Sequence, residues 1–238
     1  MTMAIGVGPY SGMPISLRRE PVMATNIAAK SLKDQNRWQL WLVIVANVVA
    51  FYVVLQYDVL STAGFKAMFA TVSNLLPIGL AIVVTTVLNG ILSSSAKERL
   101  VFLRWNQTLP GHRAFSKHGP ADSRIDMTAV AALCGGNVPS DPAEQNRTWY
   151  RLYKSVEHHP SVSQVHKDFL LTRDYAGFAA IFLVVFGITA VSFVQSWRMA
   201  LGYCAALALQ FLIVRHAAAT YGVRFTQTVL AEKSAATV

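Results

Sequence analysis

Four stretches of the chain, residues 38–57, 67–92, 175–194 and 199–217, are apolar on every face and hold no acidic residue. A helix needs about 20 mostly apolar residues to cross the hydrocarbon layer of a bilayer. Buried helices of a soluble protein would instead carry a polar face at the helical period, and these stretches do not. The pattern therefore predicts four transmembrane helices, each with its backbone amides bonded inside its own segment.

The composition agrees with a membrane protein. Hydrophobic residues make up 53% of the 238 positions and charged residues only 14%, whereas a soluble domain carries about 25% charged residues. The mean hydropathy is +0.39. These values exclude collagen-like, coiled-coil and disordered classes. The net charge of +9 indicates that the few charged residues face an anionic leaflet or an acidic partner.

The basic residues predict the orientation, because cytoplasmic flanks of membrane proteins collect lysine and arginine. Only Lys66 lies between the first two predicted spans, and only Arg198 lies between the last two. The segment between the second and third spans holds Lys97, Arg99, Arg104, Arg113, Lys117, Arg124, Arg147, Arg151, Lys154, Lys167 and Arg173. We expect both termini and this segment in the cytoplasm, with the spans in a bacterial inner membrane.

The predicted fold class is all-α: four transmembrane helices in two hairpins, with a small helical cytosolic domain between the second and third spans. The expected divisions are a cytosolic N-terminal tail and basic helix (1–37), a first hairpin (38–92), the helical domain (93–174), a second hairpin (175–217) and a cytosolic C-terminal tail (218–238). The N-terminal stretch lacks the apolar region of a signal peptide. The first span is therefore expected to direct insertion.

Capping signals predict the helices of the cytosolic domain. Ser95 with Glu98 three residues later forms a capping-box pattern, so residues 96–106 are expected to continue the second span outward as a rigid stalk. Asp126 is expected to cap a short helix over residues 127–134.

The strongest helix signal in the domain begins at Asp141, which precedes Pro142 at the first helical position. This helix is expected to run to about His158. Pro160 then opens a helix that is expected to continue into the third span.

Basic side chains of the domain are candidates for binding an anion or a partner. Arg147, Arg151 and Lys154 follow one face of the helix after Asp141, opposite an apolar face. Arg113 lies in a donor-rich loop, residues 109–118. The alternative for the helix is a solvated basic face, which is common. The alternative for Arg113 is an ion pair with Asp122 or Asp126.

The centres of the predicted spans hold no ionisable residue, which argues against a proton- or ion-coupled pump. They carry amide and hydroxyl groups, and these are candidates either for hydrogen bonds between helices or for the wall of a water path. The residues selected are Asn47, Asn74, Thr85, Asn89 and Gln210.

Signals for catalysis, metals and cofactors are weak. Ser116, His112 or His118, and Asp122 are the types of a hydrolytic triad, but no nucleophile-elbow motif surrounds Ser116. The histidines and cysteines lack the paired spacings of a zinc site. No phosphate-binding loop or dinucleotide fingerprint occurs in the sequence. We therefore expect neither enzymatic activity nor a cofactor nor a metal, and no disulfide between the two cysteines.

Several segments of the central region resemble a family of bacterial inner-membrane proteins with four spans and a helical cytosolic insert, for which no activity is established. They are residues 97–105 (KERLVFLRW), 109–116 (LPGHRAFS), 122–126 (DSRID), 149–154 (WYRLYK) and 173–174 (RD). The resemblance supports the fold and the location. It also implies a role beside a cytosolic partner, as in membrane components of stress or phage-defence systems.

The sequence thus favours a non-enzymatic, homo-oligomeric membrane protein whose basic cytosolic domain docks a partner or senses a ligand. That partner is a cytosolic protein or an anionic ligand; nucleic acid is a further option that no motif supports. A first alternative is a channel or facilitator for a small solute, with Asn74, Thr85, Asn89 and Gln210 along its path. A second alternative is a membrane-tethered enzyme.

Overall fold

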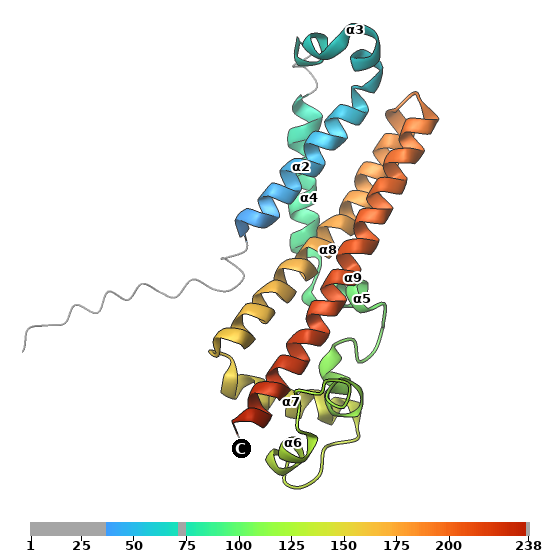
Figure 1. Cartoon of the computed structure of the whole chain (residues 1–238). Coiled ribbons are helices and arrows are strands. Elements are labelled where there is room, and N and C mark those ends of the chain that lie inside the picture. The colour runs from blue at the N-terminus through green and yellow to red at the C-terminus, as the bar shows by residue number, and fades with distance from the viewer. Residues whose placement is uncertain (1–36, 71–74, 237–238) are drawn as a thin grey trace, which may run out of the picture. The chain divides into compact units, whose positions relative to one another are not determined.

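The computed structural model describes residues 37–70 and 75–236. Its helices are α2 (Arg37–Leu55), α3 (Tyr57–Ala70), α4 (Leu75–Ile91), α5 (Ser94–Phe102), η2 (Pro110–Arg113), η3 (Ala114–His118), α6 (Met127–Leu133), α7 (Pro142–Val156), α8 (Pro160–Phe193) and α9 (Trp197–Ala235). Figure 1 shows α8 and α9 as a long antiparallel pair, with α2 and α4 along one end and α6 and α7 at the other. The expected N-terminal tail, residues 1–36, lies outside the described residues.

Every regular element in the described residues is helical, which confirms the all-α prediction. Three of these helices, α2, α8 and α9, are long and apolar enough to cross a membrane. The second predicted span corresponds to α4, which has 17 residues and follows directly on residues 71–74, outside the described part. By length and composition, the described residues therefore contain three candidate membrane-spanning helices.

Helices α8 and α9 are much longer than a bilayer is thick. With 34 and 39 residues, they extend for about 50 and 60 Å at a rise of about 1.5 Å per residue, against about 30 Å for the hydrocarbon layer. Each contains one apolar half and one half with polar and charged residues. The expected continuation of the helix from Pro160 into the third span is confirmed, because α8 has no interruption.

The apolar halves are joined by aromatic packing. Phe51 of α2 stacks on Phe186 of α8 with ring centroids 4.4 Å apart. Ile44 and Val48 lie on the same buried face of α2, against Phe182 and its neighbours. The outward faces remain apolar, for example Ile188 and Ile213, which are 64% and 60% exposed. Such outward faces are expected where lipid is the solvent.

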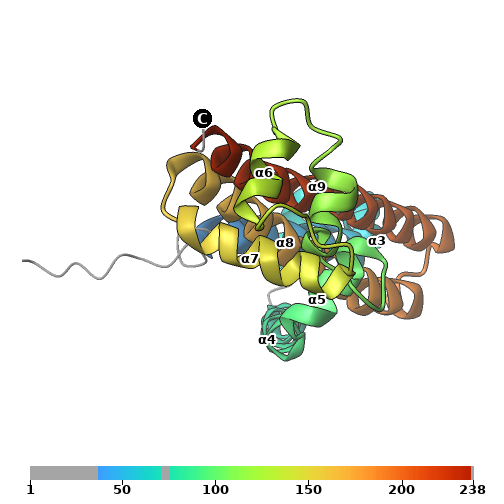
Figure 2. The ribbon, with the colours of Figure 1, turned by 90° about the horizontal axis from the view of Figure 1, so that it is seen from below.

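The polar halves of α8 and α9 form two sides of a small helical unit, seen from below in Figure 2. Phe225, Val229 and Leu230 of α9 are buried against Trp149 of α7 and Phe169 of α8. The expected C-terminal tail (218–238) is wrong for residues 218–235, which form the last turns of α9, because their apolar side chains complete the core of this unit.

The capping predictions for α6 and α7 are confirmed. Asp126 accepts hydrogen bonds from the amides of Thr128 and Ala129, and Asp141 accepts one from the amide of Glu144 at the start of α7. A buried glutamine on α7, which the sequence did not single out, fixes the preceding turn. Gln145 Oε1 accepts hydrogen bonds from the amides of η3 residues Phe115 and Ser116 at 3.2 Å.

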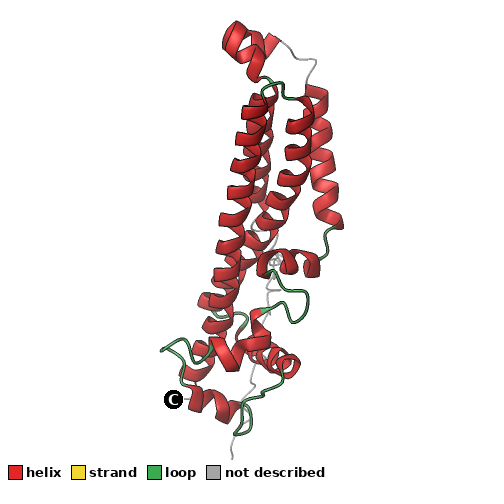
Figure 3. Cartoon of the chain, turned by 90° about the vertical axis from the view of Figure 1, so that its right-hand side faces the viewer, coloured by secondary structure: helices red, strands yellow, loops and turns green. Residues whose placement is uncertain are grey.

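The predicted stalk after the second span is wrong. Helix α4 ends at Ile91, and Ser93 rather than Ser95 caps a separate helix, α5, by accepting the amide of Ala96. Figure 3 shows α5 turned across the long helices and not in line with α4. Val101 and Lys97 of α5 are buried against α8 and α9. The burial of this face outweighs the tendency of the helix to continue straight.

Gly222 of α9 marks a close approach between helices. A Cβ at this position would lie 2.7 Å from Phe102 Cζ and 3.0 Å from Phe169 Cε2, so both rings would have to move. We expect Gly222→Ala to lower the stability of the protein in detergent by about 1–3 kcal/mol, measured by thermal unfolding. Gly202→Ala, on the same helix with nothing within 4 Å of the added carbon, is the matched control. Equal unfolding temperatures for the two variants would contradict the close approach.

Candidate functional site

A cavity of about 290 Å³ lies in the helical unit, between α7, α8, α9 and the segment 109–111. Its wall is rich in aromatic side chains, and its polar side chains, apart from Thr226, are charged or able to titrate. The lining side chains with rings are Trp149, Tyr150, Tyr153, His166, Phe169 and Phe225, and those with charge are Glu98, Lys154 and Arg173. A small apolar pocket with few polar groups is the usual form of a ligand site.

The rings are fixed by contacts with one another. The His166 ring stacks on Phe225 at a centroid distance of 4.6 Å, and Tyr153 packs edge-on against both. Trp149 lies edge-on to Phe225 at 5.3 Å, and its Nε1 donates to the Thr226 carbonyl at 3.3 Å. These contacts hold the wall in place without a ligand, so a planar ring can enter without a large ordering cost.

A cluster of four charged side chains lies at one side of the cavity, where α5 crosses α8. Arg173 Nη2 lies 3.1 Å from Asp174 Oδ1, and Arg173 Nη1 lies 3.8 Å from Glu98 Oε1. Lys97 Nζ lies 3.5 Å from Asp174 Oδ1, with both side chains at least nine-tenths buried. The cluster ties α5 to α8 immediately beside the apolar half of α8. Removing one member of a buried pair of this kind typically costs about 3–5 kcal/mol.

Burial shifts the titration of the groups around the cavity. It raises the pKa of Glu98, more than the nearby Arg173 lowers it. Burial also lowers the pKa of His166, with a further decrease from the charge of Arg173, so this ring is neutral at neutral pH. The pKa of Tyr153 is raised by burial. Among the lining residues, Arg173 and Lys154 thus face one carboxylate, Glu98, whose charged form is disfavoured. Each cation also pairs with a carboxylate outside the lining, Arg173 with Asp174 and Lys154 with Glu157.

This arrangement suits a small aromatic ligand with an acidic group. Rings stack on rings at a gain of about 0.5–1.5 kcal/mol per pair. A carboxylate or phosphate on such a ligand could accept hydrogen bonds from the guanidinium of Arg173, since arginine forms directed hydrogen bonds to anions. Glu98 is only loosely paired with Arg173, at 3.8 Å, and so is the group that an incoming anion would replace.

Most of these residues were not predicted as a site from the sequence. Glu98 was considered as part of a capping box and Arg173 as one of the basic residues of the central segment, and His166 and Phe225 were not selected. One signal was available: a Lys-Glu pair directly after one apolar stretch and an Arg-Asp pair directly before the next have complementary charges. Helices joined by a cytosolic segment bring such flanking pairs to the same level of the membrane.

The predicted anion-binding residues do not converge on one site. Lys154 lies at the cavity, where it also pairs with Glu157. Arg151 donates to Thr148 Oγ1 at 3.1 Å on its own helix, and Arg147 is exposed. Arg113 donates to the Gln107 carbonyl at 3.3 Å, and the Asp122 carboxylate binds Arg124 instead.

The polar residues selected in the spans have separate surroundings. Gln210 Nε2 donates to the Tyr175 hydroxyl at 2.9 Å, a bond between α9 and α8. Asn47 donates to the Val43 carbonyl on its own helix at 2.9 Å. Thr85 is fully buried. Asn74 and the side chain of Asn89 lie outside the described part.

The residues of the imagined triad are engaged elsewhere. His112 Nδ1 lies 3.0 Å from the Pro142 carbonyl, and Ser116 Oγ donates to Gln145 Oε1 at 3.2 Å. His118 is buried. Burial and the neighbouring cations lower its pKa to about 4. Asp122 forms its ion pair with Arg124. In the described residues, no group of three metal-binding side chains is present, and both cysteines are free.

Comparisons of the chain with protein-family models, with curated proteins and with solved structures found no match.

His118 predicts a pH dependence of stability. Its folded pKa of about 4 lies below the value of about 6.5 of an unfolded chain, so the unfolded state binds more protons between these values. The contribution of His118 to the free energy of unfolding is therefore fully present above about pH 6.5 and is lost as the pH decreases towards 4. We expect His118→Leu to flatten this part of the stability curve, measured by denaturant unfolding at each pH. His158→Gln, at a side chain that is 97% exposed, should leave the curve unchanged. An identical slope for wild type and His118→Leu would show that another group carries it.

Proposed function

We propose that the protein is a non-enzymatic sensor of the bacterial inner membrane that binds a small aromatic anion in the cavity of its cytosolic helical unit. The observation that carries this proposal is the cavity itself, with its aromatic side chains and with two cations, Lys154 and Arg173, against one carboxylate, Glu98, among its lining residues. The lining groups that could act as a base are engaged with neighbours, since His166 Nδ1 lies 3.2 Å from the Tyr153 hydroxyl and Glu98 pairs with Arg173; this favours binding over chemistry.

The proposed topology has four spans, with α4 and the residues before it as the second span. Support comes from the distribution of lysine and arginine, which are dense in residues 97–173 and nearly absent from the two short connections. Both termini and the helical unit then face the cytoplasm. The apolar outward faces of α2, α8 and α9 leave surface for lipid and for further copies of the chain in an oligomer.

The proposed signal passes through Arg173. This residue lines the cavity, and it also pairs with Glu98 on α5 and with Asp174 on its own helix. An anionic ligand that binds Arg173 displaces Glu98, which loosens the attachment of α5 to α8. Helix α5 follows α4 after a two-residue break. Ligand binding is thereby coupled to the position of α4 against α8.

The topology is tested by labelling cysteines with a membrane-impermeant maleimide. Cys134 and Cys204 are first replaced by serine, and single cysteines are introduced as Ser140→Cys and Gln195→Cys. We expect Gln195→Cys to react in intact cells, because it lies in the connection between α8 and α9. Ser140→Cys should react only after the cells are lysed. The reverse pattern would overturn the proposed orientation.

Ligand binding is tested with the full chain in nanodiscs, by equilibrium dialysis against three indoles that differ in charge. The probes are indole-3-carboxylate, indole-3-methanol and indole-3-methylamine, with empty nanodiscs to correct for partition into lipid. We expect the carboxylate to bind tightest and the amine weakest. Lys154→Gln should weaken the carboxylate about threefold, the equivalent of an exposed ion pair, while Lys117→Gln, at an exposed lysine outside the cavity, should have no effect.

The same assay separates displacement of Glu98 from simple attraction. Glu98→Gln removes the carboxylate that competes for Arg173, so it should tighten indole-3-carboxylate by about threefold and leave indole-3-methanol unchanged. Glu144→Gln, an exposed carboxylate at the start of α7, is the matched control. Equal binding of all three indoles, or no change in Glu98→Gln, would contradict the proposed site.

A further inference from the structure

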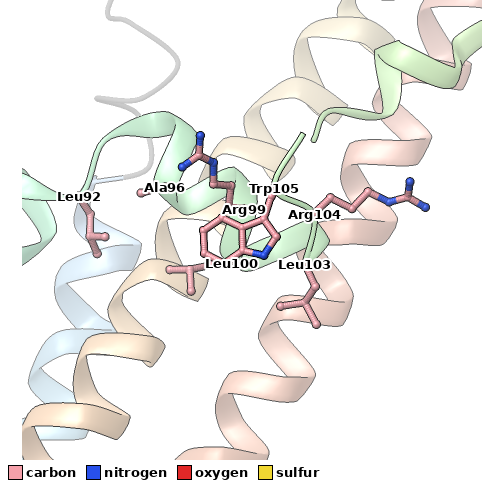
Figure 4. A pocket seen from close by; sticks show the side chains of 7 residues that line it. All are labelled: Leu92, Ala96, Arg99, Leu100, Leu103, Arg104 and Trp105. Atoms are coloured by element: carbon pink, nitrogen blue, oxygen red, sulfur yellow. The ribbon is translucent and has the colours of Figure 1, made fainter. Parts of the chain in front are cut away.

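A second hollow lies outside the helical unit, on the outer face of α5. It has a volume of about 420 Å³, and its side chains come from α5 and the residues on either side of it. In Figure 4 the side chains of Leu92, Leu100 and Leu103 point to one side, whereas the guanidinium group of Arg99 points to the other. The hollow is therefore mainly apolar. Its three leucines form its apolar half, and Arg99, Arg104 and Trp105 form a basic half at its edge.

The apolar half is formed at a cost in backbone conformation. Leu103 ends α5 in the left-handed region, with φ 49° and ψ 44°. Glycine or asparagine normally occupies this position, because a larger side chain there is strained. The leucine is also 64% exposed. Strain and exposure at the same apolar residue indicate that its side chain has a contact surface outside the chain.

The basic half holds two arginines and a tryptophan. The Arg99 guanidinium lies over the Trp105 ring at 5.8 Å from its centroid, and Trp105 is 79% exposed. Within the described residues, no carboxylate lies within ion-pair distance of Arg99 or Arg104. Arg104 is close enough to Arg113 to lower the pKa of that residue. The positive charge at this end of α5 is thus not neutralised by the protein.

In the four-span topology proposed above, α5 and the hollow lie at the edge of the membrane. Leu92 directly follows α4, and the buried face of α5 lies on α8 and α9 beside their apolar halves. A helix that leaves the membrane and turns across its neighbours lies along the boundary between acyl chains and headgroups. Tryptophan and arginine are the residues that favour this boundary, with apolar side chains below them.

We propose that the hollow on α5 binds one anionic phospholipid of the surrounding leaflet. The phosphate lies at Arg99, with Arg104 adding positive charge on the same end of α5, the acyl chains lie along Leu92, Leu100 and Leu103, and the Trp105 ring lies at the level of the glycerol. Charge complementarity selects an anionic lipid over a neutral one. The exposed leucines select a lipid over a soluble phosphate, which would leave them in water.

The test is native mass spectrometry of the full chain, released from detergent after addition of phosphatidylglycerol or phosphatidylcholine. We expect one phosphatidylglycerol to remain bound and phosphatidylcholine to bind about tenfold more weakly, since each basic group near a lipid phosphate contributes to retention. The double variant Arg99→Gln/Arg104→Gln should lose this preference. The double variant Arg124→Gln/Arg224→Gln removes two exposed arginines elsewhere and should keep it.

Two further measurements are needed. One uses a variant that should fold normally, and the other tests whether a lipid or a soluble phosphate is bound. Leu103→Asn suits the left-handed backbone and keeps both arginines, so it should fold normally yet hold phosphatidylglycerol more weakly. Glycerol 3-phosphate should not displace the lipid at millimolar concentration. Equal retention of both lipids, retention by Arg99→Gln/Arg104→Gln, or displacement by glycerol 3-phosphate would each overturn the assignment. The indole assay uses another cavity, so its failure leaves this result unaffected.

Discussion

The structure depends on two long helices. Each has an apolar segment sufficient to cross a hydrocarbon layer, and each is longer than that layer is thick. Helices α8 and α9 have 34 and 39 residues, and no flexible connection separates their apolar halves from their polar halves. One half is suited to lipid as its solvent, and the other half is buried by α6, α7 and the turns η2 and η3. A small unit of this size gains a sufficient core only because the two long helices supply part of it.

Because α8 and α9 are continuous, a movement of these helices in the helical unit is transmitted to their apolar halves. The cavity is bounded by α7, α8 and α9, so a change in its width alters the separation of the same helices further along their length. The charge cluster around Arg173 adds a second connection through α5. Its members pair with more than one neighbour, and a group with two partners can exchange one of them for a ligand at a small cost. The proposed binding site therefore has surroundings that suit the proposed role as a sensor.

The most useful sequence signals were local ones. Asp126 and Asp141 begin their helices as predicted, because a side chain that accepts a backbone amide two or three residues later needs no distant partner. The predicted stalk failed for the opposite reason: the direction of α5 depends on the burial of Val101 and Lys97 against α8 and α9. The anion-binding residues were chosen from one helix face, while the cavity gathers Arg173 and Lys154 from two helices.

By itself, the sequence determined the helical class and the apolar segments, since composition and period act within a single segment and require no knowledge of its neighbours. It also determined the caps of α6 and α7, for the same reason. Only the tertiary structure decided that the last residues of α9 are part of a core, that Lys97 and Glu98 meet Arg173 and Asp174, and that the aromatic side chains of α7, α8 and α9 enclose a cavity. Such contacts join residues far apart in the chain, for example 77 positions in the Lys97–Asp174 pair and 109 positions in the hydrogen bond from Gln227 to the His118 carbonyl, and their pairing is decided by the way the long helices pack.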